Sequence, residues 1–282
     1  MSLKQQRATD VTTGYGQGKK FMRLIRALCA SCVVTAGALF SGPSAAGQLD
    51  GPELLKDTKL YFTAPLRWDG EDWLYFGGTL LAIGAAHEYD ENVRNHFTAG
   101  STTALDGKDA HSTRDAIPTA AILVGTFAFA ALVGDRAGYE EGWSMVEAAG
   151  FTAVSTTVVK FAAGRKRPNE TTQVDDWRNS GDSFPSLHVS EAFAIGTVLA
   201  ESGGDDYRWV RRILGYGIAT ATAYARVHDN AHWLSDTVAG AALGMATAHF
   251  VMNRRDARET RSSFNVAPAN GGVMLTYSFT PR

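Results

Sequence analysis

The stretch Arg226-Val-His-Asp-Asn-Ala-His232-Trp-Leu-Ser-Asp236 places a histidine six residues after an arginine and four residues before an aspartate. If the segment from His232 onward is helical, His232 and Asp236 lie on one face, one turn apart. The carboxylate can then accept a hydrogen bond from one imidazole nitrogen and leave a lone pair on the other. Such a histidine is a good nucleophile or base, and the planar guanidinium of Arg226 suits an anionic target.

A histidine and an aspartate at this spacing are, on their own, more often a surface or core hydrogen bond than a functional site. The stretch Lys160-Phe-Ala-Ala-Gly-Arg-Lys-Arg167-Pro168 adds two cations. Lys160 and Arg167 are about two helical turns apart, so both side chains can point the same way on a helix. Pro168 then stops that predicted helix.

A third stretch, Ser183-Phe-Pro185-Ser186-Leu187-His188, adds backbone donors. Its Pro-Ser pair opens a predicted helix, which leaves N–H groups without helical partners beside a serine hydroxyl and a histidine. The start of a helix with a serine is a ready site for an anion.

In chain order the three stretches read Lys-x6-Arg-Pro, Pro-Ser-x-His and Arg-x5-His-x3-Asp. This three-part pattern resembles the type 2 phosphatidic acid phosphatase (PAP2) superfamily, which includes class A acid phosphatases and vanadium haloperoxidases. The resemblance covers roughly residues 115–252. It implies an all-α fold, a six-helix PAP2-like bundle, and a phosphoric ester hydrolase that works through a phosphohistidine without a metal or another cofactor.

The resemblance also implies a role for each motif residue. His232 is the expected nucleophile, Asp236 orients it, and His188 protonates the leaving group and then activates water. The expected phosphate-binding residues are Lys160, Arg167, Ser186, Leu187 and Arg226. Vanadate is an expected inhibitor, because it mimics pentacoordinate phosphorus beside His232.

Two positions depart from the family pattern and leave alternatives open. Leu187 stands where the family normally has glycine, and Ala225 stands where it normally has serine. Pro-Ser-Leu-His is similar to the version in inositol-phosphoceramide-synthase-type members, which transfer lipid head groups. The sequence therefore predicts a phosphatase for phosphomonoesters, lipid phosphates or pyrophosphates, with a head-group phosphotransferase as the alternative. A vanadium haloperoxidase, with vanadate as cofactor, ranks last because members of that class are much longer chains.

The N-terminus reads as an export signal. A basic region with Lys19, Lys20, Arg23 and Arg26 precedes the apolar run Ala27–Phe40, and small residues allow cleavage after Ala46. An uncleaved anchor helix is the alternative. We expect export to the periplasm or to the periplasmic face of a bacterial membrane. Lys and Arg number 27 against 29 Asp and Glu, a balance that does not suggest nucleic acid as a partner.

The domain prediction is an extension and signal over 1–46, a linker over 47–72, a PAP2-like helical domain over 73–252 and a tail over 253–282. Ala-, Gly- and Thr-rich apolar stretches predict the six helices. Their ranges are Trp73–His87, Ile117–Val133, Trp143–Ala163, Ser186–Ala200, Ile213–Val227 and His232–Met252. Whether lipid or water surrounds them, and whether the chain forms oligomers, stays open. The polar connection Asn169–Asp182 is either a lid over the site or a plain surface loop.

The remaining features predict little chemistry. Alternating apolar residues from Val273 to Phe279, after a Gly-Gly turn and the potential partner strand around Phe264, predict a short C-terminal β-hairpin appendage. His87, close to Glu88 and Asp90, is interpreted as part of a solvated helix end. No compact cluster of metal ligands stands apart from the motifs.

Overall fold

Helices dominate the computed structural model, which describes residues 51–99, 116–133, 136–204, 207–259, 262–269 and 272–279. The described residues all belong to one unit, residues 46–282. The predicted export signal and its cleavage site lie outside the described residues.

The described residues contain eight α-helices and one short 3-10 helix, η1, so the prediction of a six-helix bundle is wrong in number. The six predicted helices correspond to α3 and α5–α9, while α2 and α4 are additional. α4 is short, and only Val93 and Phe97 lie at helical spacing on its apolar side in an otherwise polar segment, so no long apolar stretch marks it in the sequence. The elements are α2 (Gly51–Phe62), η1 (Ala64–Arg67), α3 (Gly70–Glu88), α4 (Asp90–Thr98), α5 (Ile117–Val133), α6 (Arg136–Ala163), α7 (Leu187–Glu201), α8 (Arg208–His228), α9 (Leu234–Glu259), β1 (Ser262–Ala269) and β2 (Gly272–Phe279). The two strands pair antiparallel, with Ser262 opposite Phe279.

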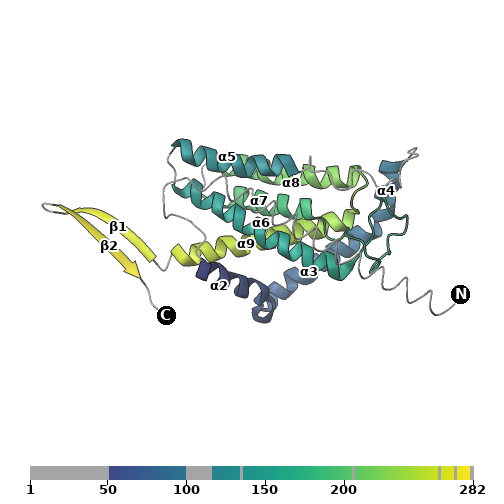
Figure 1. Ribbon diagram of the computed structural model, residues 1–282, viewed down its shortest axis with the longest axis horizontal. Coiled ribbons are helices and arrows are strands. Elements are labelled where there is room, and N and C mark those ends of the chain that lie inside the picture. The colour runs from purple at the N-terminus through teal and green to yellow at the C-terminus, as the bar shows by residue number, and fades with distance from the viewer. Residues whose placement is uncertain are drawn as a thin grey trace, which may run out of the picture. The chain divides into compact units, whose positions relative to one another are not determined.

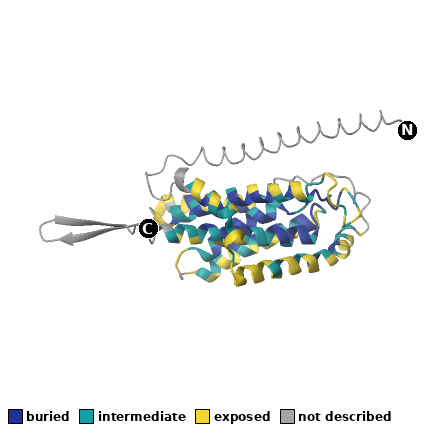
Figure 2. Cartoon of the chain, turned by 90° about the horizontal axis from the view of Figure 1, so that it is seen from below, coloured by how far each residue is buried: buried dark blue, intermediate teal, exposed yellow. Residues whose placement is uncertain are grey.

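Helix α7 lies among the other long helices and packs on α6, α8 and α9 (Figure 1). Buried residues gather where these helices face one another, and exposed residues lie on their outer sides (Figure 2). The approach of α7 to α8 is close because glycines meet there. A Cβ atom at Gly196 would lie 2.5 Å from the carbonyl oxygen of Gly215. No larger residue fits at this crossing without moving backbone.

A similar contact fixes the start of α7 against α9. A Cβ atom at Gly240 would lie 2.8 Å from the carbonyl oxygen of Ser186, and one at Gly244 would lie 2.2 Å from that of Ser190. Because these glycines admit the backbone of α7, the Pro-Ser-Leu-His segment lies directly beside the first turns of α9. This contact brings the second and third motifs together.

Helix α2 and η1 lie within segment 47–72, and α2 packs on the long helices. The ring of Tyr61 stacks on Phe151 at 4.9 Å and meets Phe250 edge-on. The buried carboxylate of Asp57 accepts a hydrogen bond from Arg254 Nε on α9 at 2.9 Å. A buried ion pair therefore ties α2 to the C-terminal half of α9.

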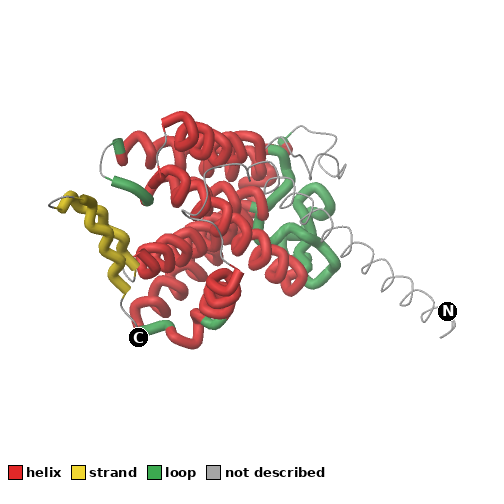
Figure 3. The backbone as a smooth tube through the Cα atoms, turned by 60° about the vertical axis from the view of Figure 1, so that its left-hand side comes forward, coloured by secondary structure: helices red, strands yellow, loops and turns green. Residues whose placement is uncertain are grey.

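The long loop between α6 and α7 lies at one end of the helices (Figure 3). α6 ends at Ala163, where Gly164 adopts a left-handed conformation (φ 55°) and its N–H donates to the carbonyl of Lys160 at 2.9 Å. A glycine with positive φ just after the last turn is a common helix stop. Of the helices in the described residues, none combines the length and the apolarity that a membrane crossing demands.

Candidate active site

His232 lies in the turn between α8 and α9 and is only 2% exposed. Its backbone N–H, like that of Ala231, donates to the carbonyl oxygen of Arg226 at 3.1 Å, so the end of α8 fixes the turn. α9 begins at Leu234, so His232 precedes the helix and Asp236 lies in its first turn. The prediction that both residues share a helix face is therefore wrong, although the two side chains still meet.

The contacts of the imidazole define its two nitrogens. Nε2 of His232 lies 3.1 Å from Nη1 of Arg167, and Nδ1 lies 3.5 Å from Oδ2 of Asp236. A guanidinium has only donors, so Nε2 must carry the lone pair and the neutral ring must carry its proton on Nδ1. The nitrogen with the lone pair thus faces the cations, and the protonated nitrogen faces the carboxylate.

Burial lowers the pKa of His232 well below its usual value, and the positive charges of Arg167, Lys160 and Arg226 lower it further. The side chain is therefore neutral at neutral pH, as a nucleophile must be.

Lys160 and Arg167 reach the site from different kinds of backbone. Lys160 lies in the last turn of α6, but Arg167 lies in the segment after Gly164, so the prediction of one shared helix is wrong. Nζ of Lys160 donates to the carbonyl oxygens of Asp182 and Ser183. Burial, reinforced by the charge of Arg167, lowers the pKa of Lys160 to about 7. Its charge therefore depends on pH in the physiological range.

Arg167 is 5% exposed, and hydrogen bonds to the loops on either side of the site hold its guanidinium in place. Its Nε donates to Oδ1 of Asp182 at 2.7 Å, and its Nη1 donates to the carbonyl of Ala231 at 3.0 Å. The carboxylate of Asp182 is half-exposed, at the end of the polar connection Asn169–Asp182. Through Asp182, this connection therefore contributes a side chain directly to the site.

The start of α7 offers unoccupied hydrogen-bonding capacity. Ser186 is fully buried and precedes the first helical residue, Leu187, and its side chain does not cap the helix. Within the described residues its hydroxyl has no hydrogen-bond partner. An unpaired buried hydroxyl is unfavourable unless a ligand completes it. His188 follows in the first turn and is half-buried. These features suit an oxyanion.

The remaining motif residues are also buried. Arg226 is fully buried in the last turn of α8, and its charge acts on both His232 and Lys160. The structure thus brings Lys160, Arg167, Ser186, Arg226, His232 and Asp236 into one cluster, with Leu187 and His188 at its edge. In the parts of the chain that the structure describes, no three His, Cys, Asp or Glu side chains converge in a way that could hold a metal ion.

Asp236 makes stronger contacts with residues that the sequence analysis did not single out. Its Oδ1 accepts a hydrogen bond from Nη1 of Arg165 at 2.7 Å. Its Oδ2 accepts from the hydroxyl of Ser183 and from the backbone N–H of Trp233 at 3.0 Å. Arg165 is fully buried and packs over the rings of Trp177 and Trp233. The sequence does contain a signal for Arg165, because the run Arg165-Lys-Arg167 places a further cation inside the first motif.

Asp90 is the least expected member of this network. It is 1% exposed, and its Oδ2 accepts from Nη2 of Arg165 at 2.7 Å. His87 bridges Asp90 and Asp175, at 3.0 and 2.9 Å. The interpretation of His87 and Asp90 as a solvated helix end is therefore wrong for Asp90. A single sequence carries no local signal that an acidic residue in a polar helix will be buried.

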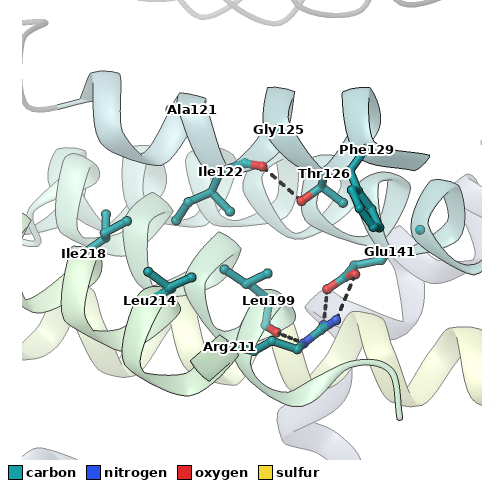
Figure 4. Close-up of a pocket in the computed structure, with 11 residues that line it drawn as sticks. Ala121, Ile122, Gly125, Thr126, Phe129, Glu141, Leu199, Arg211, Leu214 and Ile218 are labelled. Atoms are coloured by element: carbon teal, nitrogen blue, oxygen red, sulfur yellow. Dashed lines mark hydrogen bonds and ion pairs between the residues drawn. The ribbon is translucent and has the colours of Figure 1, made fainter. Parts of the chain in front are cut away.

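A separate cavity of about 360 Å³ lies between α5, α6, α7 and α8. Figure 4 shows it lined by apolar side chains such as Ile122 and Leu214, with Arg211 reaching across to Glu141. Nε of Arg211 also donates to the carbonyl of Leu199 at 2.8 Å. Glu141 lies near the start of α6 and Lys160 near its end, about 28 Å apart at 1.5 Å per residue. This cavity therefore belongs to the other end of the bundle.

Comparisons with known proteins find one family and one partial relative. The PAP2 superfamily model matches residues 141–259. The lipid A 1-phosphatase of Porphyromonas gingivalis is 35% identical over 86 residues, which cover 30% of this chain and 17% of that protein. The match thus spans about one-sixth of the length of that relative. No solved structure matches the chain. The matched segment contains all three motifs, and residues 141–259 of this chain are similar to the PAP2 superfamily domain.

Proposed function

We propose that this chain is a phosphatase that hydrolyses phosphate esters, lipid phosphates among them, through a phosphohistidine at His232. The observation that carries the proposal is the buried, neutral imidazole whose Nε2 lone pair lies 3.1 Å from Arg167 in a cluster of three cations. Fixed cations in a buried site stabilise the charge that develops on phosphate oxygens during transfer. The kinship to the PAP2 superfamily supports the same chemistry.

In the first step, Nε2 of His232 attacks phosphorus and the bond to the ester oxygen breaks. The leaving oxygen takes a proton from His188, and the phosphoryl group stays on His232. The ring becomes positive as the N–P bond forms. Asp236, 3.5 Å from Nδ1, stabilises that charge. Lys160, Arg167 and Arg226 hold the phosphoryl oxygens, together with the hydroxyl of Ser186 and the N–H of Leu187.

In the second step, a water molecule attacks phosphorus and His188 takes its proton. The N–P bond breaks, His232 regains its lone pair, and inorganic phosphate leaves. Orthovanadate binds in the same place as an inhibitor, because it adopts the pentacoordinate geometry of the transition state.

A lipid phosphate is the favoured substrate class. The similar protein from P. gingivalis is named for action on lipid A. Large apolar side chains are also exposed on several helices, such as Leu74 on α3 and Leu132 on α5, which are 73% and 86% exposed. Apolar surface of this kind suits contact with acyl chains or with a membrane surface. Export to the periplasm, with cleavage after Ala46, would place the site among such lipids. N-terminal sequencing of the chain from a periplasmic fraction tests both points: absence of the chain from that fraction contradicts export, and a first residue other than Gly47 contradicts cleavage after Ala46.

The decisive experiment measures phosphate release by the purified protein from phosphatidic acid in detergent micelles and from a soluble aryl phosphate, with His232→Ala as the blank. We expect release from both substrates, a preference for the lipid, and none with His232→Ala. Turnover at the wild-type rate by His232→Ala refutes the phosphohistidine. A folded wild-type protein that releases phosphate from neither substrate refutes hydrolysis and favours head-group transfer, which Leu187 hints at.

A further inference from the structure

Arg165 connects Asp236 to a second carboxylate on a helix outside the family domain. Its Nη1 lies 2.7 Å from Oδ1 of Asp236, and its Nη2 lies 2.7 Å from Oδ2 of Asp90. All three side chains are at most 1% exposed. Asp90 comes from α4, about fifty residues before the segment 141–259 that the PAP2 model matches.

The position of Asp90 is fixed by donors from the first turn of α9. Its Oδ1 accepts from the backbone N–H of Ser235 at 2.8 Å, and its Oδ2 accepts from the hydroxyl of Ser235 at 2.6 Å. His87 lies 3.0 Å from the same Oδ2 and 3.2 Å from Nη2 of Arg165. A carboxylate that accepts this many bonds in a dry environment is held rigidly. Asp90 therefore connects α4 to the residue next to Asp236.

The charges of this network decide what Asp236 can do. Arg165 alone would neutralise Asp236, and a neutral pair gives little help to an imidazole that becomes positive. With Asp90 included, one cation faces two carboxylates, and the group keeps a net charge of −1. In a buried site such a charge is weakly screened. It opposes the three cations that already lower the pKa of His232.

We infer that Asp90 is a positioning residue for the reaction of His232: by offsetting the charge of Arg165, it leaves the charge of Asp236 available to the phosphorylated imidazole. The inference rests on the proposed phosphatase function. Asp90 touches no substrate and acts through Arg165 and Asp236. It links α4 to the catalytic residues, although the segment that matches the PAP2 superfamily, 141–259, does not include that helix.

The test is Asp90→Asn, which keeps the shape of the side chain and removes its charge. The matched control is Asp57→Asn, since Asp57 is equally buried and pairs with Arg254 at 2.9 Å between α2 and α9. Both variants break a buried ion pair, so both are expected to lower Tm. Only Asp90→Asn is expected to lower kcat, by about 10- to 100-fold, as when an outer partner of a metal-bound histidine is removed.

Binding of inorganic phosphate, measured by titration calorimetry, separates a role in charge from a role in structure. Without Asp90 the site is more positive, so Asp90→Asn is expected to bind phosphate at least as tightly as the wild type while kcat falls. If Asp90→Asn weakens phosphate binding, or if its kcat matches that of Asp57→Asn, the inference is overturned. If the wild type has no phosphatase activity, the proposed function fails separately, and phosphate binding alone decides the charge argument.

A double variant covers the case in which Asp90→Asn does not fold. Replacing both members of a buried pair is tolerated better than breaking it. Asp90→Asn combined with Arg165→Gln removes one negative and one positive charge, so Asp236 again supplies a net −1. We expect kcat within about tenfold of the wild type for this folded double variant. A kcat at the level of the His232→Ala blank overturns the charge argument.

Discussion

Lys160 allows a quantitative test of how the site binds anions. Lys160 is 8% exposed, and burial lowers its pKa from 10.5 to about 7, with the nearby charge of Arg167 as the second cause. A bound dianion beside Lys160 would raise the pKa of its ammonium again, because an opposite charge favours the charged form. Anion binding above pH 7 should therefore take up a proton from solution, and the affinity should fall as the pH rises.

The expected size follows from the pKa. At pH 8.5 the solution is about 1.5 pH units above the pKa of the empty site, so about one molecule in thirty keeps the charge on Lys160. Recharging the lysine then costs about 2 kcal/mol of the binding free energy. The dissociation constant should be about 30-fold higher at pH 8.5 than at pH 5.5.

Sulfate is the suitable probe, because it stays a dianion across this range and is not hydrolysed. Isothermal titration calorimetry in two buffers with different ionisation enthalpies gives the affinity and the number of protons taken up. Burial also raises the pKa of Glu191 on α7 to about 7, so the measurement is made in a Glu191→Gln background. Lys160→Arg should bind sulfate with little pH dependence, and Lys160→Met should bind weakly at both pH values.

The reasoning is refuted if sulfate binds to the Glu191→Gln protein with the same affinity at pH 5.5 and 8.5. It is also refuted if no proton is taken up at pH 8.5. If Lys160→Arg retains the full pH dependence, the titrating group is not Lys160.

His188→Ala should slow alkyl phosphates far more than activated aryl phosphates, whose leaving groups need no proton; equal losses in kcat/KM would contradict the acid role. Glu191→Gln should raise the free energy of unfolding at pH 8 by about 3 kcal/mol and change it little at pH 4. In the wild type the folded protein keeps this carboxyl protonated up to about pH 7, whereas the unfolded chain loses the proton near pH 4.5, so the free energy of unfolding falls as the pH rises between these values. Equal gains from Glu191→Gln in urea unfolding at both pH values would contradict this. Gly244→Ala should lower stability by about 1–3 kcal/mol, because the new Cβ would lie 2.2 Å from the carbonyl oxygen of Ser190. Gly217→Ala is its control: nothing lies within 4 Å of a Cβ there, so it should be neutral or stabilising in the same thermal scans, and equal losses would contradict the packing argument.

The site could be predicted from the sequence where its chemistry is local. The three motifs contain the cations, the serine and the histidines, and the structure brings His232 together with Asp236 and Arg167. Apolar stretches predicted the long helices for the same reason, since each buries a continuous surface.

The rest depends on contacts that spacing does not encode. The spacing of seven positions from Lys160 to Arg167 predicts two helical turns, but Gly164 ends α6 between them. Asp90 lies in a short polar helix, and its burial follows from Arg165, which is 75 positions later in the chain. Such pairs are visible only in three dimensions.

Trp233 places a fluorescent side chain beside the site. Its indole is 1% exposed, donates to the carbonyl of Lys166 at 2.9 Å, and lies 5.1 Å from the guanidinium carbon of Arg165. Indole emission responds to the local electric field, and a rigid, dry indole next to His232 has little solvent relaxation to obscure that response. The phosphoryl transfer that we propose to the neighbouring imidazole would change that field within a single turn of the chain. The protein therefore carries its own fluorophore beside the proposed nucleophile, and stopped-flow fluorescence is a way to follow turnover without a labelled substrate.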